Sequence, residues 1–176
     1  MERRDLLIAP AGEAALILIV GLAGYLARQP LIFASLGPTA YELIETPHRR
    51  SARPYSIFVG HLVGIGVGYL ALFLTGAWHL PAVTSAGVPF TRVWTSVLAA
   101  GLTVLGTLLL RAGQPAAIAT SLLISTGIMQ RPQDAAIIMG AVVLMIAAGE
   151  PLRKLRLKAQ ERRRKREAAE HAEFHS

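Results

Sequence analysis

Four long apolar runs, almost free of charged side chains, constrain this chain more than any other feature. They are Leu6–Ala27, Ile57–Trp78, Val93–Leu110 and Ala135–Gly149. A run of about 20 residues forms a helix ~30 Å long, which matches the hydrocarbon core of a bilayer. A soluble domain could bury one such run at its centre but not four. The chain is therefore predicted to be an all-α membrane protein, with the lipid bilayer as its main partner.

Charged residues are few and unevenly distributed. They make up 16% of the chain, against about 25% in typical soluble domains, and half of the Lys and Arg residues follow Pro151. Such clusters are typical of cytoplasmic loops and tails, whereas a nucleic-acid-binding surface would interleave aromatic side chains. We predict a transmembrane domain over residues 1–151, a basic cytoplasmic helical tail over residues 152–176, and no nucleic-acid partner. Both termini are expected in the cytoplasm, and the expected membrane is the bacterial inner (plasma) membrane.

Two short apolar segments, each interrupted by Pro and Gly, lie between the long runs. The first is Leu31–Leu43, broken at Gly37-Pro38, and the second runs from Gly113-Gln114-Pro115 to Met129. Each half of the chain thus reads long, short, long. We predict four long transmembrane helices plus two short Pro/Gly-broken membrane helices, arranged as two inverted three-element repeats. That inversion requires both short segments to cross the membrane; re-entrant segments are the alternative, and the distribution of basic residues favours crossing.

The two breaks and one histidine are the candidate solute site. A helix that begins at mid-membrane leaves amide N–H groups unpaired, and its dipole favours an anion. His61 lies a few residues into a long run, where an ionisable group is a functional candidate. The structural alternatives are Ser and Thr bonds to the preceding turn and a single hydrogen bond from a neutral His61 to a backbone carbonyl of a neighbouring helix. The candidate substrate-binding residues are Ser35, Gly37, Pro38, Thr39, Arg53, His61, Gln114, Pro115, Thr120 and Ser121.

Other residue patterns predict packing and exclude several kinds of chemistry. Gly60, Gly64 and Gly68 stand four residues apart on one helix face, which lets another helix approach closely and makes a homo-oligomer conceivable. The chain has no cysteine, which excludes disulfides and thiolate metal sites. It also lacks a Gly-rich phosphate loop, a zinc-type histidine pair and a nucleophile elbow. We therefore expect no enzyme activity, no catalytic residues, no metal and no cofactor.

Several blocks of the sequence resemble the HPP family of integral membrane proteins. They are Gly37-Pro38-Thr39-Ala40, Ala52-Arg53-Pro54 and Gly60-His61-Leu62. Gln114-Pro115-Ala116-Ala117-Ile118-Ala119-Thr120 sits where that family has His-Pro-Pro-Ala-Gly-Ala-Thr. The resemblance extends from Ala14 to Gly149. Gln114 replaces the histidine that names the family, Ala116 replaces its second proline, and Arg53 precedes the turn proline instead of following it.

The resemblance implies a multi-span membrane protein with a transport role. Plant plastid relatives are linked to nitrite movement, and Gln114 could still hydrogen-bond a solute although it cannot carry a proton as histidine does. The expected function is a small-solute transporter or channel, for a small inorganic anion such as nitrite. The alternative is a non-transporting membrane scaffold or a subunit of a larger membrane complex.

Overall fold

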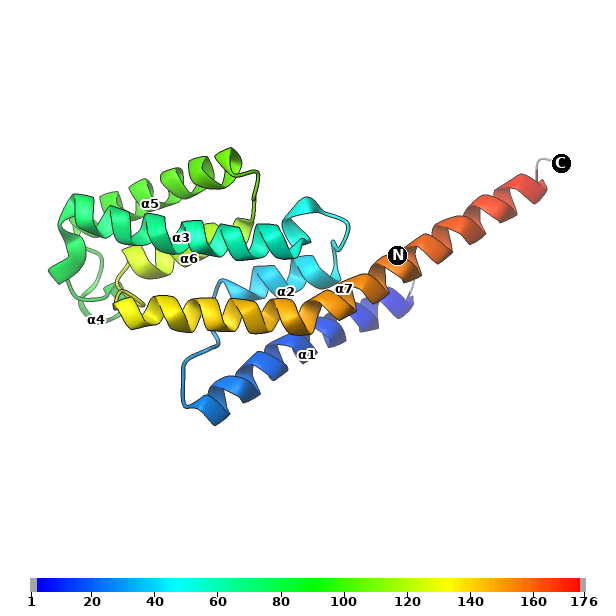
Figure 1. The fold of residues 1–176 in the computed structure, drawn as a ribbon, viewed down its shortest axis with the longest axis horizontal. Coiled ribbons are helices and arrows are strands. Elements are labelled where there is room, and N and C mark those ends of the chain that lie inside the picture. The colour runs from blue at the N-terminus through cyan, green and yellow to red at the C-terminus, as the bar shows by residue number, and fades with distance from the viewer. Residues whose placement is uncertain (1–2, 175–176) are drawn as a thin grey trace.

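The computed structural model describes residues 3–174, and all regular structure within them is helical (Figure 1). The helices are α1 (Arg3–Ala27), α2 (Leu36–Ile44), α3 (Pro54–Thr75), α4 (Val83–Ala86), α5 (Phe90–Leu109), α6 (Pro115–Ser125) and α7 (Pro132–Phe174), with 3₁₀ turns at Arg50–Ala52 and Ala77–His79. In this part of the chain, four helices are long and apolar enough to cross a membrane: α1, α3, α5 and α7. The predicted all-α membrane fold with four long helices is confirmed.

Proline and glycine set several of the helix ends. Helices α3, α6 and α7 begin at Pro54, Pro115 and Pro132, where the missing amide hydrogen costs nothing because the first turn has no acceptor for it. Helix α3 ends at Gly76, whose φ of 65° is left-handed and whose amide bonds back to Leu72 and Phe73. This is the usual glycine-terminated helix end.

The predicted break inside the first short segment is wrong in its position. Helix α2 begins at Leu36, so Gly37 and Pro38 lie in its first turn, and residues 30–34 are not helical. Proline is tolerated in a first turn because its absent N–H would have no partner there. At nine residues, α2 is only ~14 Å long and cannot cross a bilayer by itself.

The two short helices run in opposite directions (Figure 1). The residues between α1 and α2, together with α2, return the chain to the end of the bundle where α1 begins. Helix α6 leads from the end of α5 to the end where α7 begins. Each short helix with its flanking residues therefore connects the two ends of the bundle.

Helix contacts divide into two groups that correspond to each other. Helices α1, α2 and α7 contact one another, and so do α5, α6 and α3. If α1, α2 and α3 are matched in order to α5, α6 and α7, each contact in one group has its counterpart in the other. In this matching α7 packs with α1 and α2, and α3 packs with α5 and α6, so each half of the chain contributes its third helix to the other group. Contacts of α2 with α6 and of α3 with α7 join the groups. Two inverted repeats would produce this arrangement, and the duplication itself stays a prediction.

Small residues bring α3, α5 and α6 close together. The buried positions of α5 are mostly threonine and alanine: Thr95, Ala99, Thr103 and Thr107. Each of these threonines satisfies its hydroxyl on a carbonyl one turn earlier, so a polar residue can be buried between helices without an unpaired donor. The opposite faces of α1 and α5 expose many large apolar side chains, as lipid contact requires.

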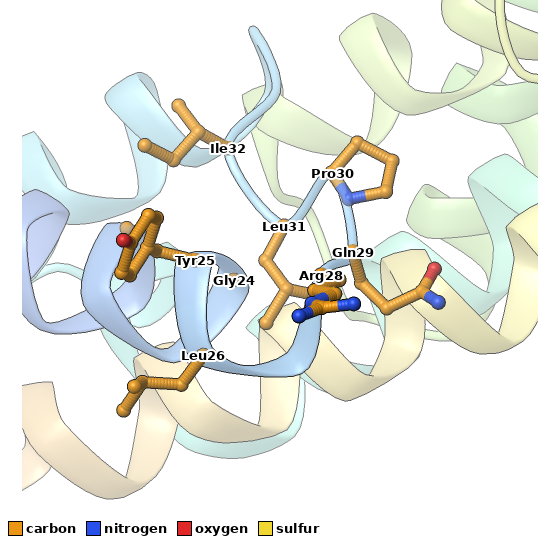
Figure 2. A pocket seen from close by; sticks show the side chains of 9 residues that line it. Gly24, Tyr25, Leu26, Arg28, Gln29, Pro30, Leu31 and Ile32 are labelled. Atoms are coloured by element: carbon orange, nitrogen blue, oxygen red, sulfur yellow. The ribbon is translucent and has the colours of Figure 1, made fainter.

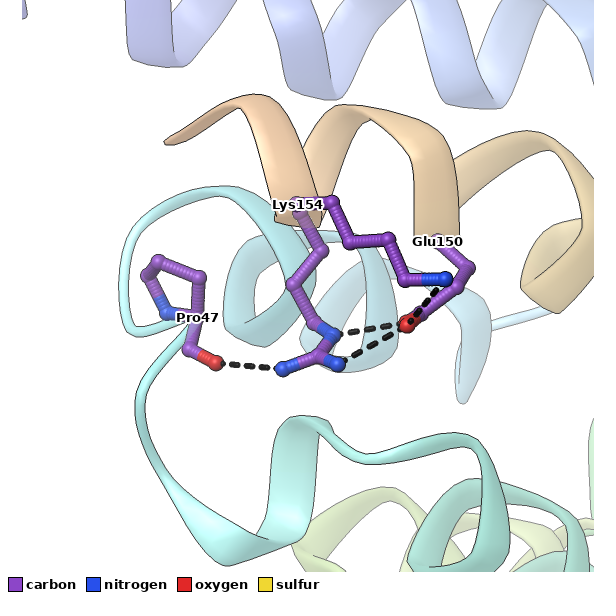
Figure 3. Close-up of polar contacts among 4 residues, drawn as sticks. Pro47, Glu150 and Lys154 are labelled. Carbon is purple, nitrogen blue, oxygen red and sulfur yellow. Dashed lines mark hydrogen bonds and ion pairs between the residues drawn. The ribbon is translucent and has the colours of Figure 1, made fainter. Parts of the chain in front are cut away.

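Helix α7 continues without interruption through Pro151 to Phe174. The boundary predicted between residues 151 and 152 therefore lies inside a helix, and residues 175–176 of the predicted tail lie outside the described part. Arg153 connects this helix to the turn after α2 through Pro47, and Figure 3 shows Pro47 opposite Glu150 and Lys154 of α7. The Arg153 guanidinium donates to both carboxylate oxygens of Glu150, at 2.6 and 2.8 Å, and to the carbonyl of Pro47 at 2.9 Å.

Arg153→Ala is expected to lower the free energy of unfolding by about 1–3 kcal/mol, because a largely buried charged donor would leave two acceptors without it. The measurement is the thermal unfolding midpoint of the detergent-purified protein. Lys154→Ala is the matched control: that side chain is 66% exposed and reaches Glu150 only at 3.6 Å, so its removal should cost at most about 1 kcal/mol. Equal shifts for both variants would contradict the structural role of Arg153.

Candidate functional site

The start of α2 lies against α6 in the interior of the protein. Thr120 Oγ1 donates to Ser35 Oγ at 3.0 Å, and both residues are fully buried. Thr39 Oγ1, one turn further along α2, donates to the Ser35 carbonyl at 3.1 Å. The structure thus brings together the two interrupted segments that the sequence places 85 residues apart.

Neither short helix has a side-chain cap at its start. Ser35 and Gln114 occupy the N-cap positions of α2 and α6, and neither side chain bonds to the amides that follow it. Because the helices run in opposite directions and touch near Ser35 and Thr120, the positive ends of both dipoles are in the same region. A helix start carries a partial positive charge of about +0.5, so this region favours a negative or electron-rich ligand.

His61 is fully buried and uses only one of its ring nitrogens. Nδ1 lies 3.1 Å from the carbonyl oxygen of Ile57, one turn earlier in α3. Nε2 is buried and has no hydrogen-bond partner among the described residues. The predicted structural alternative, one bond to a carbonyl of a neighbouring helix, is wrong in its partner, because the acceptor belongs to α3 itself. That bond uses Nδ1 only, so Nε2 is a candidate for binding a ligand.

Gln114 is also buried with unused hydrogen-bonding capacity. Its side chain belongs to a residue only 3% exposed, and neither Oε1 nor Nε2 has a partner in the described part of the chain. The residue lies against Gly60, the neighbour of His61: a Cβ placed on Gly60 would come within 2.7 Å of the Gln114 Cβ. A buried polar group without a partner costs about 1–3 kcal/mol, so both side chains are candidates for ligand binding.

The glycine face of α3 packs against α6. A Cβ on Gly64 would collide with the carbonyl oxygen of Ala117 and reach within 3.2 Å of the Thr120 Cβ, and one on Gly68 would lie 2.9 Å from the Ile124 Cβ. The three glycines therefore let α6 lie directly on α3. Gly60 in the same way lets Gln114 lie directly against α3.

The remaining predicted residues lie at the margin of this region. Pro38 and Pro115 are exposed, each within the first turn of its short helix, and Gly37 is half-buried. Ser121 is buried and donates to the Ile118 carbonyl at 2.9 Å. Arg53 is exposed as the residue that precedes α3. Arg53 is therefore not buried as Ser35, Thr120, His61 and Gln114 are.

Arg92 is a buried cation whose role the sequence did not reveal. The residue is fully buried in the first turn of α5. Its guanidinium donates to the carbonyls of Ser125, Leu80 and Pro81 at 2.8, 2.5 and 3.2 Å, and to Gln130 Oε1 at 3.0 Å. It thus joins the end of α6 to the loop after α3. The only signal was a single arginine at the start of an apolar run, which could equally mean an exposed residue.

Glu42 is a buried acid at the other end of the bundle. It is 7% exposed, its Oε1 accepts a hydrogen bond from Ser51 Oγ at 2.7 Å, and its Oε2 has no partner among the described residues. The arginines nearest to it in sequence, Arg49, Arg50 and Arg53, are exposed. Glu42 is therefore a second buried titratable group beside the short helices.

Two grooves lie along α1, away from the predicted site. One, of about 650 Å³, follows the end of α1 and the chain after it, where Tyr25, Arg28 and Gln29 stand on its rim (Figure 2). The other, of about 710 Å³, is mainly apolar and includes Glu13. None of the predicted site residues lines either groove. Tyr25, at the end of a long apolar helix, is where interfacial aromatic residues gather.

Comparison with protein-family models matches residues 1–155 to the family described as HPP, transmembrane region. Comparisons with curated proteins and with solved structures gave no match. The matched residues include every position of the predicted site.

Proposed function

This chain belongs to the HPP family of integral membrane proteins, and from that premise we propose that it moves a small solute across the membrane. The proposed solute is a small inorganic anion such as nitrite. Its proposed path passes through the region where the start of α2 meets α6, which in turn lies on α3. Nitrite is proposed among such anions because of the resemblance to the plastid relatives.

One observation carries this proposal: polar groups with unused hydrogen-bonding capacity are buried beside two helix starts. His61 Nε2 and both side-chain polar atoms of Gln114 have no partner among the described residues, while Ser35 and Thr120 add two hydroxyls. In a membrane protein, non-helical backbone and free polar groups at depth are tolerated where they line a solute site. Gln114 can donate to a bound oxyanion through its amide hydrogens, and the helix starts add positive potential.

The proposed orientation follows from the same arrangement. The turn that holds Arg49, Arg50 and Arg53 is tied to α7 through Pro47 and Arg153. The end of α5, which precedes Arg111, is tied to the start of α3 by the bond from Tyr55 to the Leu110 carbonyl at 3.2 Å. These basic residues therefore share one end of the bundle with the tail. We place that end, and both termini, in the cytoplasm of a bacterial cell.

Gln114→Leu tests the site, because it should separate function from stability. Removing two buried polar atoms without partners should leave the free energy of unfolding unchanged or raise it by at most about 3 kcal/mol. The thermal unfolding midpoint should therefore stay the same or rise. Nitrite uptake into liposomes that contain the purified protein should fall at least about tenfold, which equals the loss of ~1.4 kcal/mol of binding to the solute in transit.

Gln133→Leu, an exposed change at the start of α7, is the control and should leave both quantities unchanged. Uptake that survives Gln114→Leu would remove this residue from the solute path. Wild-type protein that is folded and monodisperse, yet moves no small anion faster than empty liposomes, would refute transport. The non-transporting scaffold or complex subunit would then be the better description.

A further inference from the structure

The hydrogen bond from His61 determines which of its ring nitrogens carries hydrogen. A backbone carbonyl can only accept, so the 3.1 Å contact with the Ile57 oxygen requires the hydrogen on Nδ1. In the neutral imidazole the other nitrogen, Nε2, then holds a lone pair. Nε2 is the atom that is buried without a protein partner. The neutral side chain therefore offers a solute an acceptor and no donor.

This tautomer conflicts with binding a bare anion. An anion such as nitrite can only accept hydrogen bonds, so its oxygens and the Nε2 lone pair repel each other. Contact requires one hydrogen between them. It arrives either on Nε2, which makes His61 an imidazolium, or on the solute, which makes it the neutral acid. Both arrangements contain one anion and one proton.

We propose that the site binds a weak oxyacid as one anion together with one proton, and that Nε2 of His61 holds that proton. This inference rests on the proposed transport function and deepens it by naming the substrate class and the coupled ion. The step breaks no bond other than the one to the proton: H⁺ and the anion enter together, and on release the imidazole returns to its neutral Nδ1–H form. The net charge moved is zero.

The helices around α3 offer few competing charges. Helix α6 has no ionisable side chain. Arg92 of α5 has its own four acceptors, and Asp134 of α7 accepts from the Arg131 amide at 2.8 Å. Glu150 is paired with Arg153.

The turns before and after α3 contribute exposed basic residues: His48, Arg49, Arg50, Arg53 and His79. Among the described residues, the remaining buried titratable group is Glu42 of α2, whose Oε2 has no partner there. The Glu42 carboxylate is therefore the alternative group that could bind the proton, and the experiment includes a variant of it.

The experiment is nitrite uptake into liposomes that contain the purified full chain, corrected for empty liposomes. An acidic exterior without a membrane voltage should accelerate uptake at least about tenfold over equal pH on both sides, since the proton is a co-substrate. A voltage imposed by a potassium gradient and ionophore at equal pH should have no effect. A pH dye inside the liposomes should record one proton for each nitrite.

Uptake that follows the voltage and ignores the pH gradient would overturn the proposal while leaving transport intact. No uptake under any gradient would instead refute the transport function on which it rests. The two failures are therefore distinguishable in one set of measurements.

Two variants locate the proton. His61→Gln keeps a hydrogen-bonding side chain that cannot be protonated and should abolish the acceleration by the pH gradient. Glu42→Gln should retain it. The reverse result would move the proton from His61 to Glu42 and overturn the assignment. The voltage and proton-counting measurements on the unaltered chain decide the coupling even where His61→Gln fails to fold.

Discussion

Gly64→Ala is expected to force α3 and α6 apart and to destabilise the folded protein strongly. The added Cβ would collide with the carbonyl oxygen of Ala117, a backbone atom that cannot move without its helix. Overpacking a close contact typically costs about 1–3 kcal/mol and occasionally more, and the upper end applies here because α6 as a whole must shift. The measurements are the yield of monodisperse protein in detergent and its thermal unfolding midpoint.

Gly66→Ala provides the control on the same helix. A Cβ at Gly66 meets no heavy atom within 4 Å, and the residue is exposed. Alanine is favoured over glycine in helices by about 1 kcal/mol, so this variant should be as stable as the original or slightly more. Similar midpoints for both variants would show that α3 and α6 are not in close contact at Gly64.

Arg92→Met is expected to give the second large effect, a loss of at least about 3 kcal/mol of stability. The guanidinium supplies hydrogen bonds to four buried or half-buried acceptors, and bonds from a charged donor contribute about 1.5–3 kcal/mol each before the cost of burying the charge is subtracted. Its loss would remove the side-chain bonds that join the end of α6 to the loop of Leu80 and Pro81 and leave the bond from the Val83 amide to the Thr126 carbonyl. The unfolding midpoint is again the measurement.

Arg131→Met is the matched control for Arg92→Met. Arg131 has the same charge, precedes α7 and is exposed. The change should shift the midpoint little, within about 0.5 kcal/mol. A stable, folded Arg92→Met protein would show that the loop and the end of α6 are held together by their other contacts. Gly127→Ala tests the same region independently, because its Cβ would occupy the space of the guanidinium at a left-handed φ of 84°.

The long helices could be predicted from the sequence because lipid contact requires uninterrupted apolar runs. The start of α6 was visible at Pro115, since proline at a helix start is a local property, whereas α3 and α7 begin at Pro54 and Pro132, before the predicted runs that start at Ile57 and Ala135. The start of α2 was misplaced because Gly37-Pro38 reads equally well as a break within a helix or as its first turn. Local sequence does not decide between these two when the preceding residues are also apolar.

The site could be predicted only in part, for a related reason. His61, Gln114, Ser35 and Thr120 were visible as polar residues within apolar surroundings. Their mutual placement depends on how α2 and α6 pack, which is a tertiary property. Arg53 was expected beside the path because it is basic and close in sequence, but an N-cap position left it exposed.

Arg92 shows a second limit of prediction from sequence: a buried residue that no local pattern indicates. Its burial depends on carbonyl acceptors contributed by residues up to 33 positions away, and the left-handed Gly127 makes the space for it. Nothing within a few residues of Arg92 signals this environment. A lone basic residue beside an apolar run is more often an exposed topology determinant.

The solute path is tested most directly by the reaction rate of a single introduced cysteine, because the sequence contains no cysteine of its own. A single cysteine replaces Ser35, which is fully buried, and the reconstituted protein is treated with a membrane-impermeant, water-soluble thiol reagent. If solute reaches the meeting point of α2 and α6 from water, Ser35→Cys should react at least about tenfold faster than Leu62→Cys on the exposed, lipid-facing side of α3, and nitrite should slow the reaction. A Ser35→Cys protein that is folded but reacts no faster than Leu62→Cys, with or without nitrite, would contradict a solute path at this point.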